Sequence, residues 1–312
     1  MLTWLVVGVG DITTKRVLPA ILAEERSELA GIVTRDPAKA APFGAPAYAQ
    51  LEDALGESKC EAVYVGTPVF LHAPQTIAAL RSGRHVLCEK PMAMNFSEAR
   101  AMAEHARAAR RLLGIAYYRR FYPKVQRARE LLAQGAIGQP VLGWATCHSW
   151  LPPNLETRSW LTDPARAGGG PLYDVASHRI DVFNYLFGKP CRVAAQLSNA
   201  VHPLAVEDSA TVMIEYETKV RAIVDVRWNT PAGDDECRIV GDEGEMELTP
   251  LNGPALVWPG GRENLPVAPN VHLPCIKHFV DAALDGAQLL SSGETALWTD
   301  WVTEQAMASG RA

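Results

Sequence analysis

The sequence has few of the features that mark disulfide-rich or metal-binding domains. Its 312 residues include only six cysteines, and no two of them form a CxxC pair. This spacing argues against a disulfide framework and against a zinc site. We therefore expect free thiols in a reducing cytoplasm and no bound metal.

An excess of one charge sign is also missing. The chain carries 30 basic and 35 acidic residues, a formal net charge of −5, and no dense block of lysine and arginine. Nucleic-acid-binding proteins usually carry a concentrated basic patch, so we expect no nucleic-acid partner. The mild acidity is compatible with a neutral small-molecule substrate but does not select one.

The sequence contains no uninterrupted membrane-spanning run. Residues 131–155 carry no formal charge, but three glycines and three prolines interrupt them, so we predict no span there. The apolar N-terminus lacks a basic region and reaches Asp11 too early for a signal peptide. We expect a cytoplasmic protein that does not associate with membranes.

What the chain does have is an ordinary globular composition, with 48% hydrophobic and 21% charged residues. The first third alternates strand and helix patterns. Apolar strand-like runs occupy 2–8, 29–34, 62–67, 85–89 and 112–117. Helical patterns occupy 15–25, 37–41, 74–83 and 97–110, with Ser97 as the expected N-cap of the last. This alternation predicts βαβ units and a doubly wound parallel sheet.

The pattern changes after about residue 120. Helical patterns occupy 122–134, 173–187, 275–284 and 295–309. Strand-like runs occupy 142–150, 210–216, 220–228, 237–241 and 245–249. Short glycine-containing connections such as 241–244 predict an antiparallel sheet. We therefore predict an α/β protein with two different sheets.

The turn after the first strand contains Gly8 and Gly10, followed by Asp11 and Ile12. In the dinucleotide fingerprint the first glycine permits a tight turn and the second lets the backbone approach the pyrophosphate. The third glycine is replaced here by Thr13, which would cap the helix or thicken its contact with the strand. An ordinary glycine turn is the alternative interpretation.

The end of the second strand indicates which cofactor the turn would bind. An acid there binds the ribose of NAD, whereas Thr34 and Arg35 suit the 2′-phosphate of NADP. We therefore favour NADP over NAD. Asp36 could serve instead if the strand runs longer, and Arg35 could be only a solvated side chain.

Three polar residues further along have the chemistry of proton transfer. Lys90 follows Glu89 at the end of a strand, where ligands bind in this topology, and could polarise a substrate oxygen. Asp174 and His178 are four residues apart on a predicted helix and so share a face. The glycine run 168–170 precedes them and would let the backbone approach a ligand. A surface turn and a satisfied core histidine are the alternatives.

Taken together, the motifs resemble one family. They are VVGVGDI at 6–12, VGTPVFLH at 65–72, HVLCEKPMA at 85–93, YYRRFYP at 117–123 and GGGPLYDVASHRIDVFNYLFG at 168–188. In this order they are similar to the glucose–fructose oxidoreductase/inositol dehydrogenase (Gfo/Idh/MocA) family of NAD(P)-dependent oxidoreductases. The segments 207–217 and 238–248 resemble that family's C-terminal sheet, so the likeness covers essentially the whole chain.

The resemblance implies a Rossmann dinucleotide-binding domain at 1–118. It also implies a substrate-binding and oligomerisation domain at 119–312 with a large, mostly antiparallel open sheet. The implied reaction is hydride transfer between NADP (or NAD) and a sugar, anhydrosugar or polyol. A homodimer or homotetramer would form through the C-terminal sheet.

The resemblance also implies roles for individual residues. Lys90, Asp174 and His178 match the catalytic set, with His178 as general base or acid, Lys90 polarising the reacting oxygen and Asp174 orienting substrate. The expected cofactor-binding residues are Gly8, Gly10, Asp11, Ile12, Thr34, Arg35, Thr67, Pro68, His72, Glu89 and Lys90. The expected substrate-binding residues are Lys90, Tyr118, Trp150, Arg158, Trp160, Asp174 and His178.

Four residues depart from the family pattern, namely Thr13, Val69, Tyr118 and Ala176. They leave the reaction type in place and put the substrate in doubt. The WLPPN segment at 150–154 resembles members that reduce 1,5-anhydrofructose with NADPH, although Trp150 and Trp160 could instead be core aromatics. A non-catalytic dinucleotide-sensing protein and a glycosidase that retains NAD remain as alternative functions.

Overall fold

The computed structural model describes residues 1–151 and 158–310. They form two compact units. The first contains residues 1–118 and 268–297, and the second contains residues 119–267 and 298–312. The chain thus passes into the second unit after Tyr118, and a later segment returns to the first.

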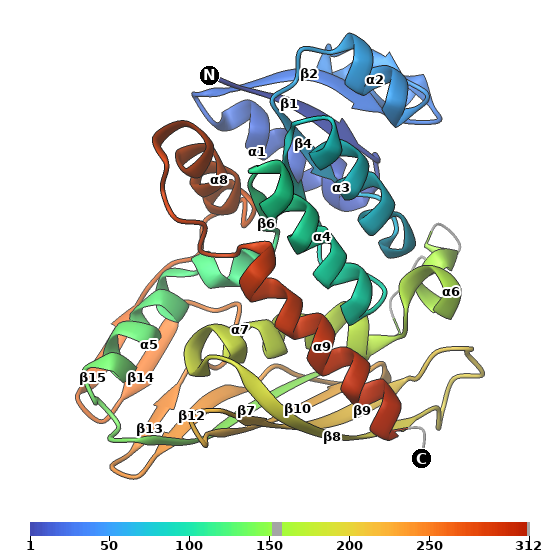
Figure 1. The fold of residues 1–312 in the computed structure, drawn as a ribbon. Helices are drawn as coiled ribbons and strands as arrows, with labels where there is room; N and C mark the ends of the chain where they lie inside the picture. The colour runs from blue at the N-terminus through green and yellow to red at the C-terminus, as the bar shows by residue number, and fades with distance from the viewer. Residues whose placement is uncertain (152–157, 311–312) are drawn as a thin grey trace. The chain divides into compact units, whose positions relative to one another are not determined.

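The first unit is built on a six-stranded parallel sheet in the order β3-β2-β1-β4-β5-β6 (Figure 1). The strands are β1 (Leu2–Val7), β2 (Ser27–Val33), β3 (Ala47–Tyr48), β4 (Ala62–Val65), β5 (His85–Cys88) and β6 (Leu113–Ile115). The helices are α1 (Leu18–Ala23), α2 (Leu51–Glu57), α3 (His72–Arg81), α4 (Phe96–Ala109) and α8 (Leu273–Asp285). All four residues of β4 are buried, as expected for a strand covered on both faces.

The start of α4 corrects one local prediction. The N-cap is Asn95, whose side-chain oxygen accepts a hydrogen bond from the Glu98 backbone N–H at 2.9 Å, and Ser97 already lies inside the helix. Glu98 in turn accepts from the Met94 N–H. The side chains of Asn95 and Glu98 also bond to each other, which fixes Asn95 as the N-cap, so the prediction for Ser97 is wrong.

Helix α8 explains why residues 268–297 pack with the first unit. The Phe279 ring lies 5.3 Å from the Trp4 ring of β1, and it packs against Gly114 of β6, where a Cβ would come within 2.9 Å of it. At the surface, Arg26 pairs with Asp281 and Asp285. A segment that we expected in the second domain thus buries its apolar face on the first sheet.

The second unit is built on a nine-stranded mixed sheet. Its strand order is β15-β14-β13-β12-β7-β10-β9-β8, with β11 also pairing with β7. The strands are β7 (Pro140–Trp150), β8 (Pro190–Ser198), β9 (Ser209–Tyr216), β10 (Arg221–Arg227), β11 (Asn229–Asp234), β12 (Cys237–Gly241), β13 (Glu245–Glu247), β14 (Ala255–Trp258) and β15 (Gly261–Asn264). Every pairing is antiparallel except β10 with β7. The predicted α/β class with a parallel sheet and a mostly antiparallel sheet is therefore confirmed.

One face of this sheet is covered by helices. The second unit contains α5 (Pro123–Ala133), α6 (Pro164–Ala167), α7 (Ser177–Phe187) and the larger part of α9 (Gly293–Gly310). Helix α7 packs on the sheet through Phe183 and Phe187, which lie against Gly143 of β7 (Figure 1). Asp181 of α7 also forms a buried ion pair with Arg120 at 2.8 Å. Among the described residues of the second unit, no helix covers the other face (Figure 1).

In the ranges that the structure describes, no helix is both long enough and apolar enough to span a membrane.

Candidate functional site

The turn after β1 has the geometry that a dinucleotide requires. Gly8 adopts a φ of +90°, and a Cβ there would lie 2.9 Å from the Gly66 carbonyl oxygen. A Cβ on Gly10 would instead meet nothing within 4 Å, so the backbone there can be approached closely by a ligand. Among the other residues of the turn, Asp11 forms an exposed ion pair with Lys15 at 3.0 Å, and Ile12 is exposed.

Thr13, the first departure, is accommodated by a second glycine. Thr13 is not the N-cap of the turn, which is Ile12, and it is buried, with 1% exposure. A Cβ on Gly66, just after β4, would lie 2.7 Å from the Thr13 hydroxyl oxygen. The close approach that the fingerprint normally gains from its third glycine is thus supplied by Gly66 on the neighbouring strand.

The end of β2 shows which of Thr34, Arg35 and Asp36 are engaged in local contacts. The strand ends at Val33, so it does not extend to Asp36. The Asp36 carboxylate accepts from the Ala38 N–H at 3.1 Å and caps the short helix that follows. Thr34 bonds locally to the backbone of Asp36, and Arg35 is exposed.

The loops after β4 and β5 are tied together by one buried histidine. His72, at the start of α3, places its two ring nitrogens 2.8 Å from the Thr67 carbonyl oxygen and 2.9 Å from that of Pro91. Burial lowers the pKa of His72, although these two contacts oppose the effect. Pro68 precedes the 3₁₀ turn that begins at Val69. The second departure, Val69, is buried and so contributes packing in place of a polar contact.

Glu89 fixes the main chain at Lys90. One carboxylate oxygen accepts from the Lys90 N–H at 3.0 Å, and the other accepts from Tyr64 at 2.6 Å and from His272 at 3.1 Å. Burial alone would raise the pKa of Glu89, but the bonds from His272 and Tyr64 and the charge of Lys90 outweigh burial and lower it to about 2. An ionised carboxylate is therefore held directly beside Lys90.

In the second unit, Asp174 and His178 lie at the start of α7. Asp174 is on a π-helical turn, Leu172–Ala176, and His178 is in the first turn of the α-helix that follows. His178 is 5% exposed and Asp174 is half-buried. π-Turns of this kind frequently occur at functional sites. Ala176, a third departure, is fully buried between the two residues.

Glu207 holds the glycine run that leads into this turn. One oxygen of its carboxylate accepts from the Gly170 N–H at 2.8 Å and from the Leu172 N–H at 3.1 Å. A Cβ on Gly170 would come within 2.1 Å of the Glu207 carbonyl oxygen, so only glycine fits. The glycine run therefore allows the backbone to pack closely on Glu207. A carboxylate at the start of a helix also interacts favourably with the helix dipole.

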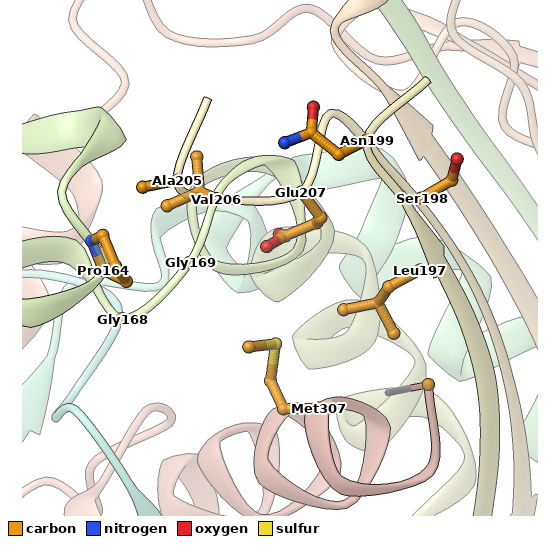
Figure 2. Close-up of a pocket in the computed structure, with 11 residues that line it drawn as sticks. Pro164, Gly168, Gly169, Leu197, Ser198, Asn199, Ala205, Val206, Glu207 and Met307 are labelled. Atoms are coloured by element: carbon orange, nitrogen blue, oxygen red, sulfur yellow. The ribbon is translucent and has the colours of Figure 1, made fainter. Parts of the chain in front are cut away.

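A cavity of about 310 Å³ adjoins the same run. Figure 2 shows the Glu207 side chain between Gly169 and Asn199, with Met307 of α9 on another side. Among the described residues its lining includes neither Asp174 nor His178. We therefore assign it no part in the candidate chemistry.

The aromatic residues expected to contact substrate have different environments. Trp150 is 50% exposed and meets the His202 ring edge-on at 4.7 Å, so its alternative interpretation as a core residue is wrong. Arg158 and Trp160 are half-buried. The rest of the WLPPN segment, from Pro152, lies outside the described residues. Tyr118, the fourth departure, packs its ring 4.8 Å from the His272 ring.

The structure thus gathers the predicted residues into two groups. Gly8, Thr67, His72, Glu89 and Lys90 follow β1, β4 and β5 or are tied to them in the first unit. Asp174 and His178 are grouped in the second. Sequence reasoning missed Tyr64, His272 and Glu207, which act through contacts distant in sequence. No group of three potential metal ligands occurs in the part of the chain that the structure describes.

Comparison with known proteins identifies the family. Residues 2–117 match the oxidoreductase family with an NAD-binding Rossmann fold, and residues 125–247 match the GFO/IDH/MocA C-terminal domain. This chain belongs to the Gfo/Idh/MocA family of oxidoreductases. The family resemblance inferred from the motifs is therefore confirmed, as is a Rossmann domain for a nicotinamide dinucleotide.

Individual relatives of this family member cover most of its length. It is 29% identical to a 1,5-anhydro-D-fructose reductase from Ensifer adhaerens, over 99% of this chain and 97% of that one. It is 31% identical to D-xylose 1-dehydrogenase (NADP(+)) 2 from Haloferax volcanii, over 78% of this chain and 75% of that one. Among solved structures, an aldose–aldose oxidoreductase from Caulobacter crescentus matches with a TM-score of 0.89 and 26% identity, over 99% and 97% of the two chains.

Proposed function

We propose that the protein transfers a hydride between a nicotinamide dinucleotide and a sugar, anhydrosugar or polyol. The observation that carries this proposal is Lys90, whose main chain is fixed by the ionised Glu89 at the carboxyl end of β5. In a doubly wound sheet ligands bind at these strand ends. The names of the relatives described above, reductases and dehydrogenases of sugars, support this reading over a non-catalytic dinucleotide sensor.

In this mechanism the dinucleotide, when bound, supplies or accepts the hydride. The open backbone at Gly10 would receive its pyrophosphate. Lys90 would donate a hydrogen bond to the reacting oxygen and so stabilise the charge that develops on it. His178 would take the hydroxyl proton during oxidation or return it during reduction, while Asp174 orients the substrate. These are the roles that the resemblance of the motifs to the family implies.

The substrate class follows from the remaining side chains. The exposed ring of Trp150 and the half-buried Trp160 offer flat surfaces to the apolar face of a sugar ring. The Arg158 guanidinium and the Tyr118 hydroxyl can bond to ring hydroxyls. An anhydrosugar has both an apolar ring face and ring hydroxyls. The full-length similarity to a 1,5-anhydro-D-fructose reductase supports an anhydrosugar as the first substrate to test.

Arg35 should decide between the two dinucleotides. Because Asp36 is engaged in its own cap, we propose that Thr34 and Arg35 receive a 2′-phosphate and that NADP is preferred. A hydrogen bond to a charged group contributes about 1.5–3 kcal/mol. Arg35→Ala should therefore weaken NADPH binding about 10- to 100-fold and leave NADH binding within about twofold.

Fluorescence titration of the wild type and of Arg35→Ala with both dinucleotides measures this directly. Lys39→Ala, an exposed lysine four residues further on, is the matched control for loss of a surface charge. An equal effect of Arg35→Ala on both dinucleotides would contradict the NADP assignment. Binding of neither dinucleotide to the wild type would contradict the proposed function itself.

We further propose that the uncovered face of the nine-stranded sheet binds a second copy of this chain. Met213, Ile223, Trp144 and Arg238 are successive cross-strand neighbours on that face, and Met213 is 55% exposed. A parallel row places Glu215 between Arg192 and Arg221. When two such faces meet about a twofold axis, these alternating charges can pair across the interface while the apolar row is buried.

Met213→Lys tests the interface because it puts a charge next to Ile223, in the apolar part of the row. We expect sedimentation equilibrium to show an oligomer for the wild type and a weakened assembly for Met213→Lys. Glu25→Lys, an exposed position of the first unit, is the control and should behave as the wild type. A wild type that sediments as a monomer would overturn this assignment.

All six cysteines are free. Free thiols are compatible with the reducing cytoplasm that we propose as the protein's location. Recovery of the protein from an oxidising extracytoplasmic fraction would contradict that location.

A further inference from the structure

A buried cluster behind Lys90 contains a histidine from a distant part of the sequence. His272 lies just before α8 and is 2% exposed. Its Nε2 donates to Glu89 Oε1 at 3.1 Å, and the Tyr64 hydroxyl donates to the same oxygen at 2.6 Å. The other oxygen, Oε2, accepts from the Lys90 N–H. One carboxylate is thus held by three donors from three segments of the first unit.

The charge on Glu89 depends on these donors. Burial disfavours a carboxylate, and His272 is the leading influence against burial in lowering the pKa of Glu89 to about 2. Without the His272 bond, burial would be opposed by the bonds from the Tyr64 hydroxyl and the Lys90 N–H and by the charge of Lys90. The pKa of Glu89 would then rise toward the pH range in which the enzyme works.

The other titratable groups around Glu89 stay uncharged near pH 7. Burial raises the pKa of Tyr64 and of Cys275 and lowers that of His72. The groups that face Glu89 are Tyr64 of β4, Lys90 after β5, His72 of α3, Cys275 of α8 and His272. His272, Tyr64 and Lys90 are therefore the partners that keep Glu89 ionised, and His272 has the largest effect among them.

His272 also contacts the part of the first unit that leads into the second. Its ring packs on Tyr118 with a centroid distance of 4.8 Å. The Asn270 side chain accepts from the His272 backbone N–H at 3.1 Å, which fixes the backbone that carries the imidazole. The ring therefore has a defined place between Glu89 and Tyr118.

We propose that His272 is a positioning residue for Lys90 and acts through Glu89. His272 holds the Glu89 carboxylate ionised and oriented. The carboxylate in turn fixes the Lys90 main chain and places a negative charge near the Lys90 ammonium. This inference rests on the role of Lys90 in the proposed function. It gives the segment that precedes α8 an indirect effect on catalysis, through Glu89 and Lys90.

Two substitutions at one position separate positioning from packing. His272→Leu keeps an apolar body but removes the donor, whereas His272→Gln keeps an N–H that can reach Glu89. In His272→Leu, Glu89 should become protonated as the pH falls from 8 to 6. Between pH 8 and pH 6, we expect kcat of His272→Leu to fall at least tenfold more than kcat of the wild type. KM for the substrate should change less than about threefold. His272→Gln should retain the wild-type profile.

The double variant His272→Leu/Glu89→Gln completes the activity test. Glu89→Gln cannot ionise, so adding His272→Leu to it should introduce no further pH dependence between pH 6 and 8. A uniform loss of kcat across pH in His272→Leu, or the same new acid limb in the double variant, would overturn the proposal. A uniform loss would leave His272 with a packing role only.

A stability measurement tests the pair without relying on turnover. In the wild type the pKa of Glu89 is lower in the folded state than in the unfolded state, so its stabilising effect is complete above about pH 4.5 and is lost as the pH falls toward 2. In His272→Leu the folded-state pKa rises above the unfolded value, which reverses the sign. The Tm difference between wild type and His272→Leu should therefore shrink as the pH is lowered from 7 to 5.

The two measurements also distinguish which idea fails. A wild type with no turnover and no dinucleotide binding would refute the proposed function, yet the pH dependence of Tm would still report the Glu89–His272 pair. A Tm difference that stays constant from pH 7 to 5 would refute the pair even in an active enzyme.

Discussion

Lys90→Met is expected to lower kcat by about a thousandfold while the protein remains folded. The change removes the ammonium that would stabilise the charge on the reacting oxygen, and losses of this kind amount to about 10²–10³ in kcat. Methionine has a similar length, and the Lys90 N–H that bonds to Glu89 belongs to the main chain, so the loop should be preserved. Steady-state kinetics with NADPH and 1,5-anhydrofructose, together with thermal melting, measure both effects.

The control for Lys90→Met is Lys59→Met, an exposed lysine of the same unit. It should retain wild-type kcat. Dinucleotide binding to Lys90→Met should weaken by no more than about tenfold, because the glycine turn and the end of β2 are unchanged. A kcat within tenfold of wild type in Lys90→Met would remove Lys90 from the catalytic set.

His178→Asn should lower kcat by about 10²–10⁴, the range for loss of a positioned general acid or base. Asparagine can still hydrogen-bond in the buried position, but it cannot accept or release a proton near neutral pH. The part of the kcat profile that reports ionisation of the histidine should therefore disappear. KM should change much less than kcat, since proton transfer belongs to the transition state.

His105→Asn provides the comparison for this change, because His105 lies on α4 and bonds to Arg81 at the surface. It should leave both kcat and the pH profile unchanged. A His178→Asn protein that keeps the wild-type pH profile would show that another group transfers the proton.

The sequence was most informative where its patterns are local. The apolar runs at 2–8, 62–67 and 85–89 predicted β1, β4 and β5 closely, because each is a short, mostly buried parallel strand between turn signals. The helix at 173–187 was also predicted, although its first turn is π-helical. Spacing of hydrophobic residues reports burial of a face but not the hydrogen-bond register within one turn.

Elements without a strong pattern of their own were not predicted. Helix α2 (Leu51–Glu57), the edge strand β15 and its neighbour β14 are short and only partly buried. The return of α8 to the first unit depends on Phe279 meeting Trp4 and the bare backbone of Gly114. That choice is made by tertiary packing, which a one-dimensional pattern cannot express.

The candidate site divides in the same way. Gly8, Gly10 and Lys90 were recognisable because the turn and the strand end impose local requirements. Three other features join residues that are distant in sequence. Gly66 compensates for Thr13, Glu207 binds Leu172 from 35 positions away, and His272 binds Glu89 from 183 positions away. A departure from the fingerprint at Thr13 therefore says little about function until its partner is known.

The central claim is hydride transfer between a nicotinamide dinucleotide and a sugar-like carbonyl or alcohol. The most direct test incubates the protein with NADPH that carries deuterium at both C4 positions of the nicotinamide and with a panel led by 1,5-anhydrofructose and aldoses, followed by mass spectrometry of the products. We predict one deuterium in the reduced product, NADP formed in equal amount, and neither with Lys90→Met. Dinucleotide oxidation without deuterium in any product, or no reaction with either dinucleotide across the panel, would contradict the claim.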